Sequence, residues 1–312
     1  MLSNPDLLRK GLKLSHLRLA EALLEHGQLS TAARHLGISQ PAASRLAAEI
    51  ESITGSAPYE RSGRSIRLTP EGRALAIRAR RVLREIDEAG REIAQLGAGS
   101  IGRVSIGAVT GPAIEHVLPM VRNSRITSPN IRLEVEVNSS DRLCAMVLQG
   151  QLDFALARLP NDETADLFDF VSVGPEPVQI VVRRGHPLLH KPSPVDLSEL
   201  MSYDWVMPPP GQILRQSVEA TLREHHLPMP ARVFNTASFL LILATISQTN
   251  SVAPIARSVS ETFSGDEFVQ PVQTNISFSV EPYGIVTLRD ARHPPAVREI
   301  LAQLTQLVGL ST

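Results

Sequence analysis

The feature that most constrains the fold of this chain is a compact series of helix signals between residues 13 and 55. Leucine and alanine recur at helical spacing after Lys13, and Gly27 ends this first helix. We expect a short second helix over residues 31–36, capped by Ser30. Gly37 follows it and supplies the positive φ that a tight turn between helices requires.

A third helix, from residue 40 to about residue 54, completes this pattern. Ser39 caps it, Pro41 lies in its first turn, where a missing N–H costs nothing, and Gly55 ends it. Two short helices joined by a glycine turn are typical of a helix-turn-helix, whose second helix enters the major groove of DNA. The residues expected to contact bases and phosphates are Ser39, Gln40, Pro41, Ser44 and Arg45. An ordinary helical hairpin is the alternative.

A small β-hairpin is expected after the third helix. Residues 58–69 alternate around Ile66 and Leu68, with Gly63 at the turn. Residues 56–84 carry eight arginines and two acids, although the whole chain has a net charge of −1. The hairpin arginines suit phosphate contacts, which position a protein without reading sequence; they are Arg61, Arg64 and Arg67. A basic run that merely faces solvent is the alternative.

A long helix follows, with Thr69 as its cap and Pro70 as its first residue. Its apolar residues recur at alternating spacings of four and three, which defines a heptad seam. The seam consists of Leu75, Ala79, Val82, Ile86, Ala89, Ile93 and Leu96. One helix cannot bury such a seam alone, so we expect it to pair with the same helix of a second chain. Packing on its own domain is the alternative.

The remaining chain alternates strands and helices. Strands are expected over residues 103–108, 131–137 and 153–157, with helices over residues 112–126 and 140–149 between them. This order is typical of a parallel α/β sheet. Later strands are expected over residues 178–182 and 283–288, and later helices over residues 211–225, 237–248 and 296–307.

Motifs for catalysis and cofactor binding are absent from the sequence. Residues 97–102 match G-x-G-x-x-G, but a helix precedes them and a strand follows, the reverse of a dinucleotide site, so they favour a hinge. There is no G-x-S-x-G, H-E-x-x-H or phosphate-binding loop. His225 and His226 are adjacent, so on a helix they point about 100° apart and do not suit one metal. We expect no enzymatic activity, no cofactor and no bound metal.

The composition indicates a folded protein of about two domains, because 43% of the 312 residues are hydrophobic and 20% are charged. The single cysteine, Cys144, excludes an internal disulfide and a cysteine-based zinc site. It lies in an apolar run and is expected to be a small buried hydrophobe rather than a reactive thiol. No export signal or bilayer-spanning segment is visible, so a cytoplasmic location without membrane contact is expected.

Several segments of the first 72 residues resemble the N-terminal signature of LysR-type transcriptional regulators. They are residues 32–45, Glu51, Gly55, residues 59–61 and residues 68–72. Thr54 and Pro58 depart from the family pattern, which usually has leucine at both positions, and both concern packing between the third helix and the hairpin. The resemblance covers the whole chain in length and layout.

The resemblance implies an α/β protein in three parts. These are a winged helix-turn-helix over residues 1–68, a linker and dimerisation helix with a hinge over 69–98, and an effector domain of the periplasmic-binding-protein type over 99–312. The effector domain would consist of two subdomains, because the chain would leave the first near residue 174 and return near residue 273. Subdomain I would then comprise about 103–174 and 273–312, and subdomain II about 175–272.

An effector site is expected where the first two strands of the effector domain end, because parallel α/β sheets bind ligands at the carboxyl ends of their strands. Thr110 and Gly111 follow the first strand, and Ser139 and Ser140 follow the second. The resemblance matches Thr110 and Ser140 to effector positions. A loop of subdomain II with Pro209 and Gly211 is expected to close over them. Simple helix capping by the hydroxyls is the alternative.

The effector is expected to be a small polar metabolite, with a carboxylate or sugar acid slightly favoured over a neutral sugar. The whole sequence therefore predicts a homodimeric or homotetrameric regulator that binds double-stranded operator DNA and a small-molecule effector, with RNA polymerase as a further partner. A cytoplasmic solute-binding module with vestigial DNA binding is the alternative.

Overall fold

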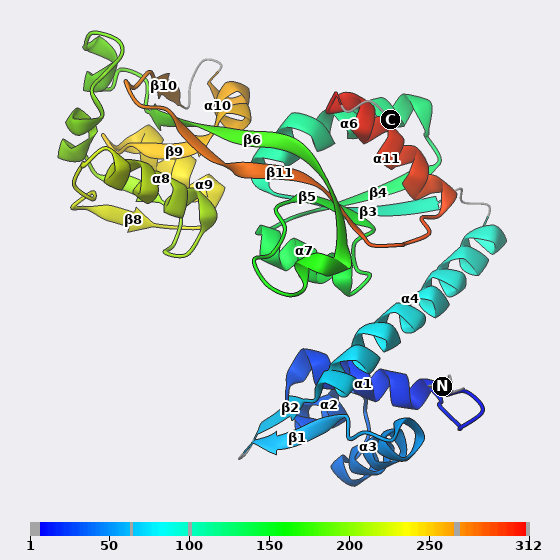
Figure 1. The fold of residues 1–312 in the computed structure, drawn as a ribbon. Coiled ribbons are helices and arrows are strands. Elements are labelled where there is room, and N and C mark those ends of the chain that lie inside the picture. The colour runs from blue at the N-terminus through cyan, green and yellow to red at the C-terminus, as the bar shows by residue number, and fades with distance from the viewer. Residues whose placement is uncertain (1–6, 63–64, 99–101, 265–268, 310–312) are drawn as a thin grey trace. The chain divides into compact units, whose positions relative to one another are not determined.

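The computed structural model describes residues 7–62, 65–98, 102–264 and 269–309. The chain forms two compact units, Met1–Gly99 and Ser100–Thr312, which are described separately below (Figure 1). Residues 99–101 of the expected hinge lie outside the described residues. No helix in the described ranges combines the length and apolarity needed to cross a bilayer.

The first unit contains four helices and one hairpin in the expected order. They are α1 (Leu14–His26), α2 (Leu29–His35), α3 (Gln40–Thr54), β1 (Tyr59–Ser62), β2 (Ser65–Leu68) and α4 (Pro70–Ala98). One expectation is wrong: α2 begins two residues early, so Ser30 lies inside the helix and Gln28 precedes it without a side-chain cap. Leu29 is buried in the core of this unit, which holds the earlier start in place.

Local caps and glycine turns set the other helix ends. Gly27, Gly37 and Gly55 follow α1, α2 and α3 with φ of 61°, 66° and 80°, values that favour glycine. The Ser39 hydroxyl accepts a hydrogen bond from the Ala42 N–H at 3.3 Å, which confirms it as the cap of α3. The Thr69 hydroxyl caps α4 by accepting from the Gly72 N–H at 3.0 Å.

Gly72 allows a close approach between the start of α4 and the segment before β1. A Cβ atom at this position would lie 1.9 Å from the carbonyl oxygen of Pro58. Thr69 completes the junction, because its hydroxyl donates to the Ala57 carbonyl at 2.7 Å. The hairpin is therefore fixed to the base of α4 by backbone contacts.

Unit two is built on a seven-stranded mixed sheet. Five of its strands are β3 (Gly102–Ala108), β4 (Ile131–Val137), β5 (Phe154–Ala157), β6 (Phe168–Val182) and β11 (Phe278–Leu288). Strands β4, β3 and β5 are parallel, as expected, whereas β11 is antiparallel to both β5 and β6. Strand β11 therefore runs in the opposite direction to its neighbours, so the sheet is not wholly parallel.

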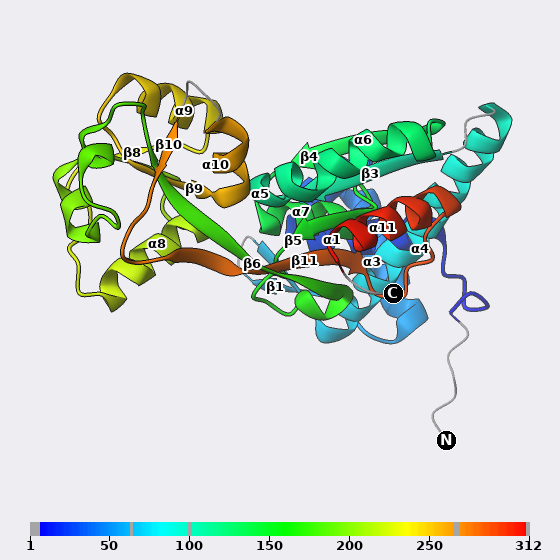
Figure 2. The same ribbon diagram turned by 90° about the horizontal axis from the view of Figure 1, so that it is seen from above.

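Helices cover both faces of this sheet in subdomain I (Figure 2). One face packs against a π-helical turn over Ala113–Val117, which follows α5 (Thr110–Pro112), and against α6 (Leu118–Thr127) and α11 (Pro295–Leu307). The other face packs against α7 (Ser140–Leu148). Side chains along β5 point to the two faces in turn, so both faces are apolar. Phe154 and Leu156 pack on the first face, and Ala155 and Ala157 pack on the second.

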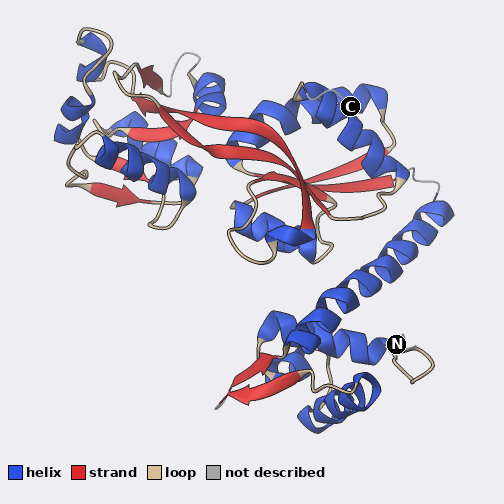
Figure 3. Cartoon of the chain, viewed as in Figure 1, coloured by secondary structure: helices blue, strands red, loops and turns tan. Residues whose placement is uncertain are grey.

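Subdomain II forms around the far halves of β6 and β11, which run through both subdomains (Figures 1 and 3). Its further elements are β7 (Trp205–Met207), α8 (Ile213–Glu224), β8 (Val233–Asn235), α9 (Phe239–Gln248), β9 (Ala253–Ala256), α10 (Arg257–Phe263), β10 (Gln270–Val272) and 3₁₀ turns at Pro187–His190 and Leu197–Ser202. A further 3₁₀ turn, Ala165–Leu167, precedes β6.

Strands β6 and β11 pass from one subdomain to the other side by side. Gly174, near which the first crossing is expected, pairs with Tyr283 on β11. The ladder between β6 and β11 shifts register between Val280 and Tyr283. Long strands and not loops therefore connect the two subdomains, and the expected return near residue 273 stays a prediction.

Three buried side chains of the second unit have structural roles. Cys144 is buried, and burial raises the pKa of its thiol to about 12, so it stays protonated and unreactive. Trp205 is fully buried and its indole N–H donates to the Leu200 carbonyl at 3.1 Å. The buried His186 accepts from the Leu188 N–H at 3.1 Å, and burial lowers its pKa.

Candidate functional site

The first turns of α3 present a polar surface. Ser39, Gln40, Pro41 and Arg45 are exposed, and Ser44 is half-buried. The opposite face of the helix is buried in the unit's core through Ala43, Ala47 and Ile50. The expected DNA-contacting residues therefore lie together on one exposed end of α3, positioned by a rigid apolar face.

A buried histidine fixes α3 to α1. His16 on α1 is 1% exposed, and its Nδ1 accepts the Lys13 N–H at 3.0 Å. Its Nε2 therefore carries the proton and donates to Oε2 of Glu49 on α3 at 2.9 Å. This hydrogen bond lowers the pKa of the Glu49 carboxyl. The sequence analysis missed this pair, although a histidine on the apolar face of α1 was a visible signal.

The hairpin lies beside the end of α1, because the Ile66 N–H donates to the Gly27 carbonyl at 3.3 Å. Arg67 on β2 is exposed, as a phosphate contact requires. The backbone of Arg61 belongs to β1, but its side chain is outside the described part of the structure, and Arg64 lies outside the described residues altogether.

The heptad seam on α4 is divided between two roles. Leu75 and Ala79 pack against α1 of the same chain, with Ala79 fully buried beside Leu17 and Ala20. Their assignment to dimerisation is thus wrong for this structure, because α1 already covers them. Farther along α4, Val82, Ile86, Ala89 and Ile93 are exposed, whereas the Leu96 side chain is not among those described.

The expected effector residues of subdomain I do not act as simple caps. Thr110 is the exposed first residue of α5, and Val109 occupies the cap position before it. Ser139 precedes α7 but its side chain makes no capping hydrogen bond. The Ser140 hydroxyl instead accepts the Arg158 N–H at 3.1 Å, which joins α7 to the end of β5.

A buried ion pair lies next to these residues. Nη2 of Arg158 donates to Oε2 of Glu176 on β6 at 2.7 Å, and both side chains are almost fully buried. The Arg158 Nε also donates to the Glu281 carbonyl on β11 at 2.8 Å. The pair thus joins the end of β5 to both strands that cross between the subdomains.

Gly111 packs directly against this ion pair. A Cβ atom at Gly111 would lie 2.0 Å from Oε1 of Glu176 and 3.0 Å from Cβ of Ala256. The Ser258 hydroxyl on α10 donates to the Gly111 carbonyl at 3.2 Å. Groups from subdomain II therefore meet the Thr110–Gly111 segment of subdomain I at this point.

An aromatic pair extends the polar cluster into subdomain I. Nε2 of His116 lies 2.6 Å from the Tyr283 hydroxyl, and the Arg158 guanidinium lies 6.0 Å from the Tyr283 ring centroid. Burial lowers the pKa of His116 and raises that of Tyr283. Both groups are therefore held neutral near pH 7, so His116 adds no charge to the cluster.

The sequence analysis missed Arg158 and Glu176. Arg158 directly follows β5, so the rule that selected Thr110 and Ser140, the carboxyl end of a parallel strand, applies to it equally. Glu176 had no such signal, because it lies within a long strand of alternating polarity. The pairing of β6 with β11 places it beside Arg158.

The predicted closing loop is not brought to this cluster by the described contacts. Pro209 and Gly211 lie between β7 and α8, where the Pro209 carbonyl accepts from the Gln212 N–H at 3.2 Å. Among the described residues, no hydrogen bond links this loop to Thr110 or Ser140. Its role as a lid remains a prediction.

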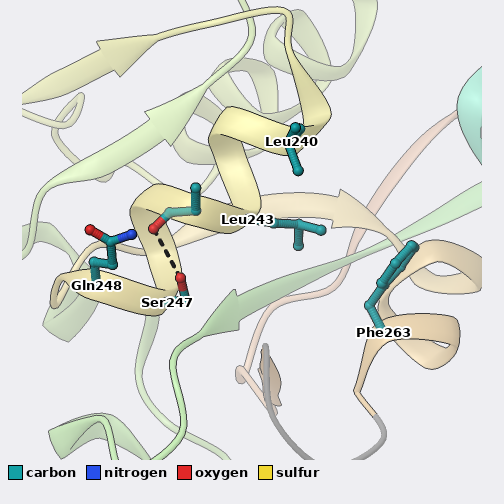
Figure 4. A pocket seen from close by; sticks show the side chains of 6 residues that line it. Leu240, Leu243, Ser247, Gln248 and Phe263 are labelled. Carbon is teal, nitrogen blue, oxygen red and sulfur yellow. Dashed lines mark hydrogen bonds between the residues drawn. The ribbon is translucent and has the colours of Figure 1, made fainter.

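A separate apolar pocket of about 310 Å³ lies on subdomain II (Figure 4). Its lining comes from α9 and α10 and consists of Leu240, Leu243, Ala244, Ser247, Gln248 and Phe263. The Ser247 hydroxyl donates to the Ala244 carbonyl at 2.9 Å, so it is satisfied within its own helix. This pocket shares no residue with the cluster around Arg158.

Comparison with known families matches both units. The family described as LysR substrate binding domain matches residues 97–309, and that described as bacterial regulatory helix-turn-helix protein, lysR family, matches residues 14–73. The chain belongs to the LysR family. LysR proteins are DNA-binding transcriptional regulators and not enzymes, so this chain is a transcriptional regulator.

Curated LysR relatives cover most of the chain. The HTH-type transcriptional regulator GbpR of Rhizobium radiobacter is 43% identical over 256 residues, which are 81% of this chain and 84% of that protein. The GbpR of Azospirillum brasilense is 39% identical over 297 residues, 95% of this chain and 87% of that protein.

Solved LysR structures share the fold. HinK of Pseudomonas aeruginosa has a TM-score of 0.54 at 20% identity, over 96% of this chain and all of that chain. Full-length CbnR complexed with its target DNA has a TM-score of 0.52 at 20% identity, over 95% of this chain and all of that one. These likenesses support the architecture of a winged helix-turn-helix, a long helix and a two-subdomain α/β domain.

Proposed function

We propose that this LysR regulator reads operator DNA with the first turns of α3 and is controlled by a small polar metabolite. The metabolite binds in a crevice between the two subdomains of the second unit, next to Thr110, Ser140 and Arg158. Binding there changes the relation between the subdomains and so the activity of the regulator on its promoter.

The buried pair of Arg158 and Glu176 is the observation that supports this effector site most directly. Burying two charges is expensive unless both are paired and hydrogen-bonded, so the chain maintains a polar centre at the subdomain junction. Gly111 and Ser258 approach the same point from subdomains I and II. A ligand that contacts this cluster therefore acts on both subdomains at once.

The charge balance of the cluster favours a polar ligand over a strongly anionic one. Glu176 neutralises Arg158, and Glu115 and Asp141 stand in the first turns of the nearby helical segments. The hydroxyls of Thr110 and Ser140 and the backbone at Gly111 offer hydrogen bonds. A sugar meets these conditions. An acid also meets them if its carboxylate replaces Glu176 as the partner of Arg158.

Calorimetric titration of the full chain with a metabolite panel tests the effector site. Loss of one ligand hydrogen bond is worth about 0.5–1.5 kcal/mol, or about 2- to 12-fold in affinity. Thr110→Val and Ser140→Ala should each lower, by that factor, the affinity for the metabolite that binds the wild type. Ser202→Ala, at an exposed position of subdomain II, is the control and should bind normally. Equal affinity in all four proteins would place the site elsewhere.

The remaining parts of the proposal concern assembly and partners. The chain acts in the cytoplasm as a homodimer or homotetramer joined through the exposed part of α4, and it regulates RNA polymerase at the promoter. A gel shift on the region upstream of its own gene tests the operator part of the proposal, because the regulator should retard a palindromic site there.

A further inference from the structure

Three potential metal ligands converge in the first unit at the ends of two helices. Glu25 and His26 end α1, and His35 ends α2. One ligand atom from each residue lies within 4.8 Å of the other two. The imidazole rings of His26 and His35 have centroids 4.7 Å apart and planes inclined by 55°. In the described ranges of the chain, this is the one group of three such side chains.

One nitrogen of the His26 imidazole is unsatisfied among the described residues. This atom, Nε2, is buried and has no hydrogen-bond partner in the described part of the chain. Buried polar side-chain atoms are nearly always satisfied, so an orphaned imidazole nitrogen requires an explanation. A metal ion coordinated by this nitrogen would satisfy it, because the nitrogen lone pair would form a coordinate bond.

The electrostatic surroundings also suit a cation. The thirteen-residue helix α1 ends at His26 and is closed by Gly27. The carbonyl oxygens at the C-terminus of a helix carry partial negative charge, which favours a cation within the last turn. The Glu25 carboxylate adds a full negative charge at the same place.

We propose that Glu25, His26 and His35 bind one divalent transition-metal ion of the zinc class. Two imidazoles and one carboxylate are a donor set that zinc accepts, with a water molecule as the fourth ligand. In such a site each ligand atom lies about 2.0–2.2 Å from the metal, so pairs of ligands are about 3.5 Å apart. Glu25 and His35 are exposed, so their side chains can close the remaining distance by rotation.

The ion would brace the helix-turn-helix. It would join the end of α1 to the end of α2, two helices that already pack together in the core of this unit. Gly27 also accepts the Ile66 N–H of the hairpin at 3.3 Å. A metal at His26 therefore stabilises both the entry to the helix-turn-helix and the base of the hairpin.

Metal binding by the untagged full-length protein tests the proposal. The protein is stripped with a chelator and titrated with Zn²⁺ by calorimetry, and with Co²⁺ by visible absorption, which reports coordination geometry. We expect one ion per chain and a melting temperature that rises with Zn²⁺. Loss of a residue that only hydrogen-bonds to a metal ligand lowers metal affinity by about 10- to 100-fold. Because His26→Gln and His35→Gln each remove a ligand itself, each should weaken binding by at least about 100-fold.

Two further variants keep the result decisive. His225→Gln removes an exposed histidine beyond α8 and should leave binding and the Co²⁺ spectrum unchanged. Glu25→Gln removes the exposed carboxylate, so it reports on the site even if a histidine variant fails to fold. Absence of a tight ion in the wild type, or binding by Glu25→Gln and His35→Gln equal to the wild type, would overturn the proposal.

Discussion

Arg158 and Glu176 form an ion pair at the junction of the two subdomains, with Nη2 of Arg158 2.7 Å from Oε2 of Glu176. The two side chains are 7% and 12% exposed, so water does not replace a lost partner. Arg158→Met should therefore lower the free energy of unfolding by about 3–5 kcal/mol, because it leaves a buried carboxylate unpaired.

Chemical denaturation measures this change. The matched control is Arg232→Met, since Arg232 pairs with Asp204 while both side chains are more than half exposed. Exposed pairs contribute about 0–1 kcal/mol. If Arg158→Met costs no more than the control, the buried pair does not stabilise the junction.

Arg45 and Arg67 should affect DNA binding in different ways. Losing a base contact of Arg45 on α3 should cost about 1–3 kcal/mol at the operator and relax discrimination against random DNA. Arg67→Ala on β2 should weaken binding to all DNA sequences alike. It should also reduce the slope of log affinity against log salt concentration by about one ion. Fluorescence anisotropy at several salt concentrations, with operator and random duplexes, distinguishes them. If Arg45→Ala discriminates between operator and random DNA as the wild type does, α3 does not recognise bases through this residue.

The exposed part of the α4 seam should join two chains. Val82 and Ile86 are 44% and 45% exposed, and replacing both by Asp would place charges in the paired seam. The double variant should therefore dissociate, and light scattering should report a lower mass. Glu85→Gln on the same helix should keep the wild-type mass. An unchanged mass in the double variant would contradict pairing through this seam.

The link between His16 and Glu49 predicts a dependence of stability on pH. The hydrogen bond from His16 lowers the pKa of Glu49 below its ordinary value of 4.5. A carboxyl whose pKa is depressed by folding stabilises the fold above the unfolded value and loses that contribution as pH falls through the folded value. Glu49→Gln should therefore be less stable than the wild type at neutral pH, and the difference should shrink below about pH 4.5.

Denaturation curves at a series of pH values check this expectation. Glu51→Gln alters an exposed carboxylate on the same helix and serves as the control. A gap between wild type and Glu49→Gln that stays constant from neutral to acid pH would show that the hydrogen bond does not stabilise the charged form.

Local sequence signals were enough to predict most of the helices and strands. The bounds of β4 match the expectation residue for residue, and β3 starts one residue early. The helix-turn-helix could be predicted from Gly37 and Ser39, because a positive φ and a side-chain cap depend on only a few adjacent residues. The exposed end of α3 could be predicted for the same reason, since helical periodicity alone assigns its faces.

Contacts between residues far apart in the chain could not be predicted from local signals. Arg158 bonds to the carbonyl of Glu281, 123 residues away, and no local pattern encodes such a contact. Ala79 keeps its heptad spacing, yet α1 covers it, because periodicity shows which face is apolar but not what packs on it. His26 and His35 come together because α1 and α2 end at the same place. Contacts of this kind depend on how elements pack, which is a property of the whole core.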